Sequence, residues 1–417
     1  MKIRSVPLGL FLAVSLLLAR PAPAQVAAVE TLSPRILALA EIIRTIEENS
    51  FYELSEKELN AVQECMAGRA FRSFEMKKGE MLKEDLKITS CFPQDKRAMY
   101  FPPAVAKNLN EAREGHFSGI GISVAPDEEI GGIAVKEILP AGPVEKDGRL
   151  KVGDVITAVG EFVEGQEIKT APLKGLDFGK MIEMVRGAPG TKIALEVRRG
   201  GQKLPLIIIA REDVKIQSVK AYEIEPGVGY LKIHSFLSLN VAADVWLVLA
   251  GFKDKNINKL IVDLRRNSGG LMNETMMIAS FFTPRIGDLI LEARWRGQKT
   301  GQGQRFTSPL TGPFSEIKTV VLIDGSSASA SEILAGSLKI WGAKVVGVKS
   351  YGKGSIQTVI PLSDGGEFSL TTGLYYLADG KTPEDGGIEP HFVIEDDPRT
   401  PDVDEALAVA TGILMDP

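Results

Sequence analysis

The stretch IDGSSASASEILAGSL, residues 323–338, decides the fold of the chain around it. An apolar run ends at Asp324, Gly325 turns the chain, and serines surround the start of an apolar-periodic helix. This pattern predicts a buried strand that turns directly into a helix. A hydroxyl at the start of a helix faces unpaired backbone N–H groups and the positive end of the helix dipole, which favour an alkoxide and an oxyanion.

The same stretch has a second interpretation in which Ser329 has no chemical role. Ser329-Ala-Ser-Glu332 matches the capping box, S-x-x-E ahead of an apolar run. This segment alone therefore leaves a nucleophilic serine and a helix cap both open.

A serine nucleophile needs a general base, and the candidate is Lys353 in SYGKGS (350–355). This segment is predicted to form the turn between two strands. A lysine can act as a base where burial lowers its pKa. Gln357 lies four positions on, so strand alternation can bring its amide to the same side as Lys353. The alternative is an exposed hairpin lysine beside an ordinary glutamine.

The segment that begins at Gly347 also matches the start of a phosphate-binding loop. However, Gly354 stands where Ser or Thr would bind magnesium, and a β-branched strand follows in place of a helix. We therefore exclude nucleotide binding at this loop.

The run LIVDLRRNSGG (260–270) predicts a further strand and a Gly-Gly loop. Free backbone N–H groups in such a loop can line an anion site, and a plain strand-to-helix turn is the alternative. Alternating strand and helix patterns continue through 213–417, which predicts an α/β core. The predicted strands are 227–233, 259–264, 319–324, 344–349 and 356–362, the predicted helices are 241–252, 272–282, 330–341 and 403–413, and 297–305 is expected to be a mobile surface loop.

Residues 116–212 differ in texture, with short β-rich runs separated by glycines. They indicate a second, mainly β domain with one or two helices. The predicted strands are 119–124, 132–138, 154–160, 191–197 and 204–210, and a helix is predicted over 178–186.

Residues 25–115 are predicted to form an N-terminal helical region. Apolar spacing predicts a helix over 35–50, and Ser55 with Glu58 matches a capping box that begins a second helix. Two further stretches are less regular: a loop-rich segment over 75–97 and a weakly helical one over 103–114.

Residues 1–24 combine a positive start, an apolar run and small residues, as in a secretory signal peptide. An uncleaved membrane anchor is the alternative, and no second apolar run of membrane length appears. Outside the cytoplasm, Cys65 and Cys91 could form a disulfide, or they could stay unpaired thiols. The sequence leaves both states open.

The composition excludes several classes of function. Only 3 histidines and 2 cysteines are present, and no HExxH occurs, so we expect chemistry that needs no metal and no cofactor. The formal charge of -5 and the lack of a basic block argue against a nucleic-acid partner. His234 and His391 lie in no recognisable triad context.

Together these segments resemble the carboxy-terminal processing proteases, also called tail-specific proteases. The family's S-A-S-A-S-E-I signature is read at 327–333, and its F-G-K-G-S-V-Q block is read as YGKGSIQ at 351–357. Its R-x-N-P-G-G loop corresponds to 265–270, with Ser268 in place of Pro, and its G-I-x-P-D element to 387–391, with His391 in place of Asp. The resemblance covers nearly the whole chain after the signal segment, although 75–115 fits the N-terminal pattern poorly.

The resemblance implies a multidomain fold, α/β and α+β, with a Ser–Lys dyad in its α/β core. Carried over residue by residue, Ser329 is the nucleophile, Lys353 the general base and Gln357 the residue that positions Lys353. The oxyanion hole would comprise the backbone N–H of Ala330 with that of Gly269 or Gly270. The neighbouring serines would then be structural, namely Ser326, Ser327 and Ser331.

Residues 116–212 resemble a PDZ domain, with Gly119, Ile120, Gly121 and Ile122 as the carboxylate-binding loop beside the helix 178–186. The resemblance implies a serine endopeptidase of the bacterial periplasm that recognises unstructured, apolar C-terminal tails and cleaves within or near them. It leaves open whether an adaptor or activator protein takes part and whether the protein is an oligomer. The alternatives are a non-catalytic PDZ scaffold on a protease-like fold and a lipid- or retinoid-binding relative without the dyad.

Overall fold

The computed structural model describes residues 34–75, 90–395 and 403–416, which form two compact units. One unit holds the described residues up to Leu109, Val219–Phe236 and those from Val241 onward, and the other holds Asn110–Ser218 and Leu237–Asn240. The predicted signal peptide lies outside the described residues. Within the described residues, no helix combines the length and the apolar character needed to span a bilayer.

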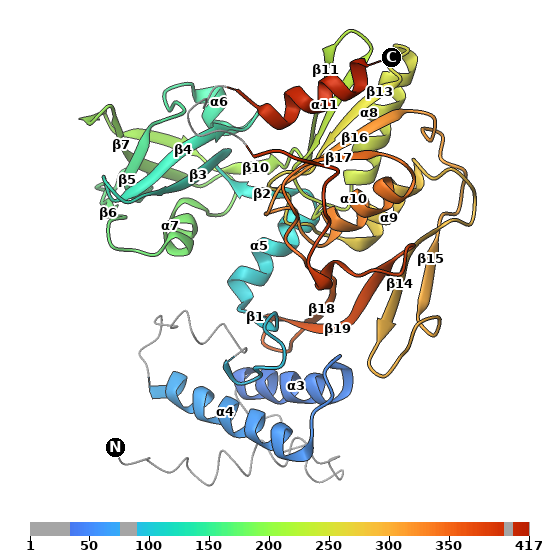
Figure 1. Ribbon diagram of the computed structural model, residues 1–417. Coiled ribbons are helices and arrows are strands. Elements are labelled where there is room, and N and C mark those ends of the chain that lie inside the picture. The colour runs from blue at the N-terminus through green and yellow to red at the C-terminus, as the bar shows by residue number, and fades with distance from the viewer. Residues whose placement is uncertain (1–33, 76–89, 396–402, 417) are drawn as a thin grey trace. The chain divides into compact units, whose positions relative to one another are not determined.

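The second unit is built on a seven-stranded antiparallel sheet with the main order β3-β4-β5-β7-β8 (Figure 1). Alternate residues of β4 and β7, such as Ile133 and Leu195, are buried beside Met181 of α7. The elements are β2 (His116–Gly119), β3 (Ile122–Asp127), β4 (Gly132–Ile138), α6 (Pro143–Asp147), β5 (Val155–Phe162), β6 (Ala171–Pro172), α7 (Phe178–Val185), β7 (Lys192–Arg199), β8 (Gln202–Lys203), β9 (Ile207–Ala210) and β10 (Glu212–Lys215). β3 is an edge strand of this sheet, so one side of it is open to a further strand.

Two of the strand predictions in this unit are wrong in part. The predicted strand 119–124 is interrupted, because Gly121 has φ +77° and bends the chain between β2 and β3. A Cβ atom at Gly121 would lie 3.0 Å from the Cα of Gly142, so the bend requires glycine. The predicted strand 204–210 begins only at Ile207.

The first unit contains a six-stranded sheet in the order β11-β12-β13-β16-β17-β20, parallel except for β11. Successive strand residues face opposite cores: Leu231 and Val262 pack toward α8, α9 and α10, whereas Tyr230 and Ile261 pack toward α11. Both faces are therefore covered, which explains the continuous apolar runs. The elements are β11 (Val219–Glu225), β12 (Val228–Ile233), α8 (Val241–Asp254), β13 (Lys259–Asp263), α9 (Met272–Ser280), β16 (Lys318–Ile323), α10 (Ala330–Ile340), β17 (Lys344–Gly347), β20 (Phe392–Val393) and α11 (Glu405–Met415). The predicted α/β core is confirmed, with β11 as an addition that the sequence pattern does not predict.

A second sheet of the same unit has the order β1-β19-β14-β15, with β18 also paired to β19. Its strands are β1 (Met99–Phe101), β14 (Leu289–Trp295), β15 (Gln304–Thr307), β18 (Ser355–Pro361) and β19 (Glu367–Leu377), and a short 3-10 helix, η2 (Pro383–Asp385), follows β19. The segment that carries Lys353 connects two consecutive strands, β17 and β18, as predicted. These strands belong to different sheets, so they do not form the hairpin considered as the alternative. The loop expected over 297–305 ends in β15, and the Glu292 carboxylate accepts hydrogen bonds from the N–H groups of Gly301 and Gly303.

The N-terminal helices are α3 (Pro34–Asn49), α4 (Glu56–Glu75) and α5 (Pro103–Arg113), close to the predicted ranges. The predicted capping box is confirmed: the N–H of Ser55 donates to Glu58, and the N–H of Glu58 donates to the Ser55 hydroxyl. Buried side chains of α3 and α4 share one core with Phe368 and Leu370 of β19. The N-terminal region thus packs on the sheet that carries Gln357.

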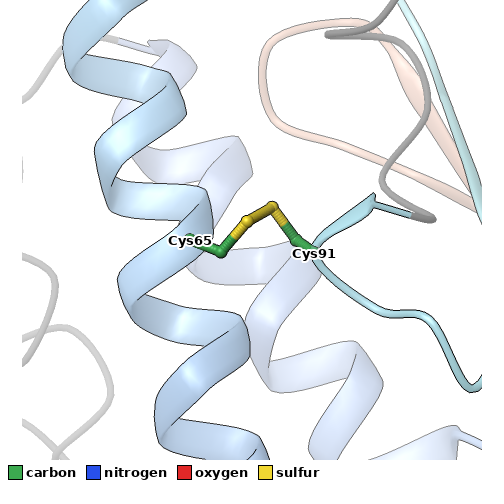
Figure 2. Close-up of a disulfide and its surroundings, with 2 residues drawn as sticks. All are labelled: Cys65 and Cys91. Atoms are coloured by element: carbon green, nitrogen blue, oxygen red, sulfur yellow. A yellow bond between two sulfur atoms is a disulfide. The ribbon is translucent and has the colours of Figure 1, made fainter.

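Cys65 of α4 and Cys91 form a disulfide, with their Cα atoms 5.4 Å apart (Figure 2). The two thiols are therefore paired, one of the two states that the sequence leaves open. Of the segment predicted to be loop-rich, residues 76–89 lie outside the described residues. The part that follows Cys91 is a run of turns leading into β1.

Candidate active site

Ser329 occupies a strained position between β16 and α10. Its backbone has φ +56° and ψ -114°, a conformation that L-residues rarely adopt. Strain of this kind persists only where the surrounding structure enforces it, and it is concentrated at functional sites. The strand–turn–helix arrangement matches the way in which α/β hydrolases expose a serine nucleophile.

The capping box that the sequence allows at Ser329 and Glu332 is present at the start of α10. The N–H of Ser329 donates to the Glu332 carboxylate at 2.8 Å, and the N–H of Glu332 also donates to the carbonyl oxygen of Ser329 at 2.8 Å. A capping role and a chemical role do not exclude each other, because Ser329 is partly exposed and a substrate can reach its side chain.

The buried carboxylate of Glu332 links the two halves of the predicted dyad. One of its oxygens accepts from the N–H of Ser329 and from the N–H of Lys353, each at 2.8 Å. The other accepts from the N–H of Gly352 at 2.7 Å and from the hydroxyl of Ser350 at 2.6 Å. A fully buried carboxylate is tolerated because four donors satisfy it.

Tyr375 of β19 makes a second link between the same two residues. Its buried hydroxyl lies 3.1 Å from the carbonyl oxygen of Ser329 and 2.9 Å from that of Lys353. Glu332 thus ties the N–H groups of both residues, and Tyr375 ties their carbonyl groups. The sequence pattern identifies Glu332 only as a cap and gives no sign of Tyr375, because no motif marks its strand.

Lys353 is partly buried, and burial lowers the pKa of its amine below the ordinary value of 10.5. The positive charge of Arg97 lowers this pKa further, whereas the carboxylates of Glu384, Glu332 and Asp95 oppose the shift. A lowered pKa leaves more of the amine neutral at a given pH, which a general base requires.

Gln357 lies on β18, where its amide contacts neighbouring hydroxyl groups. Its Nε2 donates to Thr371 at 2.6 Å and to Ser355 at 3.3 Å, and its Oε1 accepts from Ser369 at 3.3 Å. Among the described residues, no hydrogen bond joins this amide to the amine of Lys353. Its role in positioning Lys353 therefore stays a prediction.

The Gly-Gly loop lies directly against the start of α10. A Cβ atom on Gly269 would lie 2.9 Å from the Cβ of Ser329 and 3.0 Å from the nitrogen of Ala330, so only glycine fits. The N–H of Gly269 already donates to the Asn267 side chain at 2.9 Å. Within the described part of the chain, the N–H groups of Ala330 and Gly270 have no acceptor.

The neighbouring serines support this arrangement. The hydroxyl of Ser327 donates to the carbonyl of Leu264 at 2.9 Å, and that of Ser331 donates to the carbonyl of Asn267 at 2.8 Å. Both serines are buried, so they fasten the helix start to the Gly-Gly loop.

Two further features of the described residues concern His391 and possible metal ligands. His391 accepts a hydrogen bond at its Nδ1 from the N–H of Val345, beside β20, which is a structural contact. In residues 34–75, 90–395 and 403–416, no group of three or more His, Cys, Asp and Glu side chains is arranged to hold a metal ion.

The second unit contains a groove of about 220 Å³ between α7 and the bend that precedes β3. The carbonyl oxygen of Ile120 accepts from the N–H of Val144, and the carbonyl oxygen of Gly121 accepts from the N–H of Leu139. The lining residues are mostly apolar and include all four predicted loop residues: Phe117, Gly119, Ile120, Gly121, Ile122, Val124, Ile133, Phe178, Ile182, Val185 and Arg186.

Comparison with known proteins agrees with both the serine site of the first unit and the groove of the second. The family model of peptidase family S41 matches residues 227–394, and that of the PDZ domain matches residues 108–198. The carboxy-terminal-processing protease of Bartonella bacilliformis is 33% identical over 308 residues, which cover 72% of this chain and 67% of that protein. The carboxy-terminal processing protease CtpB of Bacillus subtilis is 30% identical over 345 residues, which cover 78% and 68%.

Among solved structures, the photosystem II D1 C-terminal processing protease has a similar fold, with a TM-score of 0.51 and 21% identity over 92% of this chain and 98% of that chain. The assignment of the chain to a family rests on the sequence relatives and the two family matches. The chain therefore belongs to the carboxy-terminal processing proteases of peptidase family S41, with a PDZ domain ahead of the protease core.

Proposed function

We propose that this protein is a serine endopeptidase of the bacterial periplasm that recognises unstructured C-terminal tails of other proteins and cleaves within or near them. Ser329 is the nucleophile, and Lys353 is the general base. The single observation that carries the proposal is the strained backbone of Ser329, whose side chain is partly exposed. Strain without a catalytic purpose would only lower stability.

In the first step, the amine of Lys353 takes the proton of the Ser329 hydroxyl as the oxygen attacks the scissile carbonyl carbon. The resulting ammonium then donates that proton to the leaving amine, and the peptide bond breaks. In the second step, Lys353 deprotonates a water molecule, which attacks the acyl group on Ser329. The ammonium of Lys353 then returns the proton to the Ser329 oxygen as the ester bond breaks and the second product leaves. The lowered pKa of Lys353 supports both proton transfers.

The oxyanion that forms during each step needs preorganised donors. The unused N–H groups of Ala330 and Gly270 support this assignment. Of the two glycines considered from the sequence, Gly270 is preferred because the N–H of Gly269 is occupied by Asn267.

The PDZ domain supplies the selectivity for tails. A peptide that adds to the open edge of β3 would place its side chains against the apolar wall that includes Ile182, and its terminal carboxylate near the N–H groups of the 119–122 loop. The apolar lining supports a preference for apolar tails.

The test uses folded reporter proteins that differ only in their C-terminal tails, incubated with the protein and with its Ser329→Ala variant. We expect cleavage of reporters with apolar tails, and a loss of at least about a thousandfold in Ser329→Ala. Ser326→Ala, a change of an exposed serine in the same turn, should cleave like the original protein. Equal cleavage by Ser329→Ala would overturn the proposal, and tail binding without cleavage by the unmodified protein would favour a scaffold.

A further inference from the structure

Asp95 is a fully buried acid in the N-terminal region, on the segment between the disulfide and β1. Its carboxylate accepts hydrogen bonds from the N–H and the hydroxyl of Thr371, at 2.8 and 2.9 Å, and from the N–H of Arg97 at 2.9 Å. Burying a carboxylate is costly unless its partners are fixed. Two of the three donors belong to one residue of β19, so Asp95 acts on that residue.

Thr371 is the cross-strand partner of Gln357. The register of β18 and β19 pairs the two residues, and side chains of such a pair lie on the same face of the sheet. The Gln357 amide nitrogen lies 2.6 Å from the Thr371 hydroxyl oxygen. The side chains of Asp95, Thr371 and Gln357 thus form a continuous chain of hydrogen bonds. This chain leads from the N-terminal region to the residue predicted to position Lys353.

The Asp95 carboxylate fixes which group donates and which accepts in each of these hydrogen bonds. A carboxylate only accepts hydrogen bonds, so the Thr371 hydroxyl must donate its one proton to Asp95. The Thr371 oxygen can then only accept from Gln357, which requires the NH₂ group of the amide on that side. The amide oxygen consequently lies on the other side, where it accepts from Ser369 at 3.3 Å.

We propose that Asp95 is a positioning residue of the active site: through Thr371, it fixes the orientation of the Gln357 carboxamide, the group predicted to position the amine of Lys353. The inference rests on the proposed function, because it assigns a task to the Lys353 amine. In this inference, Asp95 acts on Lys353 through Thr371 and Gln357 and does not contact the substrate.

A second contact from the same segment supports the inference. The Arg97 guanidinium pairs with Glu384 at 2.6 Å, and the other oxygen of Glu384 accepts from the N–H of Gly354 at 2.9 Å. Asp95 is therefore connected to Gln357 through Thr371, and Arg97 is connected to Gly354 through Glu384. The charged groups that act on Lys353 are Arg97, Glu384, Glu332 and Asp95.

The decisive variants change Thr371, because they leave every charge around Lys353 in place. Thr371→Val removes the hydroxyl at nearly constant shape, whereas Thr371→Ser keeps it. Thr372→Val is the matched control, since the Thr372 hydroxyl contacts Thr358 and takes no part in the chain. Each variant is assayed with an apolar-tailed reporter for kcat and KM across pH, together with its melting temperature.

We expect Thr371→Val to lower kcat by about 10- to 100-fold with little change in KM, and to move the acid limb of the pH profile to lower pH, because the ammonium form of Lys353 loses the support of a fixed carboxamide. Thr371→Ser and Thr372→Val should keep the original profile. Asp95→Asn, which can donate as well as accept, should reproduce the kcat loss of Thr371→Val.

An unchanged kcat and pH profile in folded Thr371→Val would overturn the inference while the reporter is still cleaved. So would a loss of kcat in Thr371→Val that is accompanied by an unmoved acid limb, because a merely structural role predicts that result. If Thr371→Val does not fold, Thr371→Ala, which also removes the hydroxyl and keeps every charge, decides by the same two readouts. Failure of the unmodified protein to cleave any reporter, or cleavage by Ser329→Ala, would instead contradict the proposed function.

Discussion

Two residues of the site are held in states that lower the stability of the folded protein. Ser329 has a strained backbone, and Lys353 is an amine kept partly out of water. Each state has a use in the proposed catalysis and no evident use in folding. Glu332 and Tyr375 hold both residues in place through backbone contacts, so the strain is distributed over a rigid frame.

Replacing Lys353 by methionine should abolish cleavage and stabilise the fold. Because the folded pKa of Lys353 lies below 10.5, the unfolded chain binds more protons between these two values, and the lysine's penalty is complete below the lower one. Lys353→Met should therefore raise the free energy of unfolding by about 1 kcal/mol at about pH 6, and by less at about pH 10. Urea denaturation at both pH values measures this difference, and a variant less stable at the lower pH would contradict it.

The elements of the α/β sheet are well predicted because their strands are apolar runs and their helices keep a clear period. β19 is not predicted, although it is the longest strand of its sheet, because it mixes Ser and Thr with apolar residues and is buried on both faces. The bend at Gly121 also escapes prediction, since an isolated glycine in a β-rich run does not reveal its φ angle.

Local sequence patterns likewise predict only part of the candidate active site. Ser329, Lys353 and Gln357 fall in two short motifs, whereas Asp95 and Tyr375 reach the site from distant segments whose local patterns carry no functional signal. Only tertiary structure brings such residues together.

Helix α7 should govern the affinity for tails. Ile182 lines the groove and is partly buried, so Ile182→Ser removes apolar contact from a bound tail. We expect about tenfold weaker binding of an apolar tail peptide, in line with the loss of part of one buried side chain. Fluorescence anisotropy with a labelled peptide measures the change. Val163→Ser, an exposed apolar residue outside the groove, is the control, and equal weakening in both variants would exclude the groove as the tail site.

For the molecule as a whole, the active site depends on segments that span most of the described chain. The N-terminal region contributes Asp95, the parallel sheet contributes Ser329 and the Gly-Gly loop, and the second sheet contributes Tyr375 and Gln357. The N-terminal helices share a core with β19, and the disulfide fastens the segment that carries Asp95. Loss of any of these parts should therefore disturb the positions of Ser329 and Lys353.

The central claim is that Lys353 activates Ser329, and the rate of labelling by a serine-directed fluorophosphonate tests it most directly. Intact mass and peptide mapping would follow the labelling across pH. We predict a single modification at Ser329 whose rate rises with pH through the lowered pKa of Lys353, and a loss of about 100-fold or more in Lys353→Met. Labelling of Ser329 at the same rate in Lys353→Met, or labelling of another serine in its place, would contradict the account.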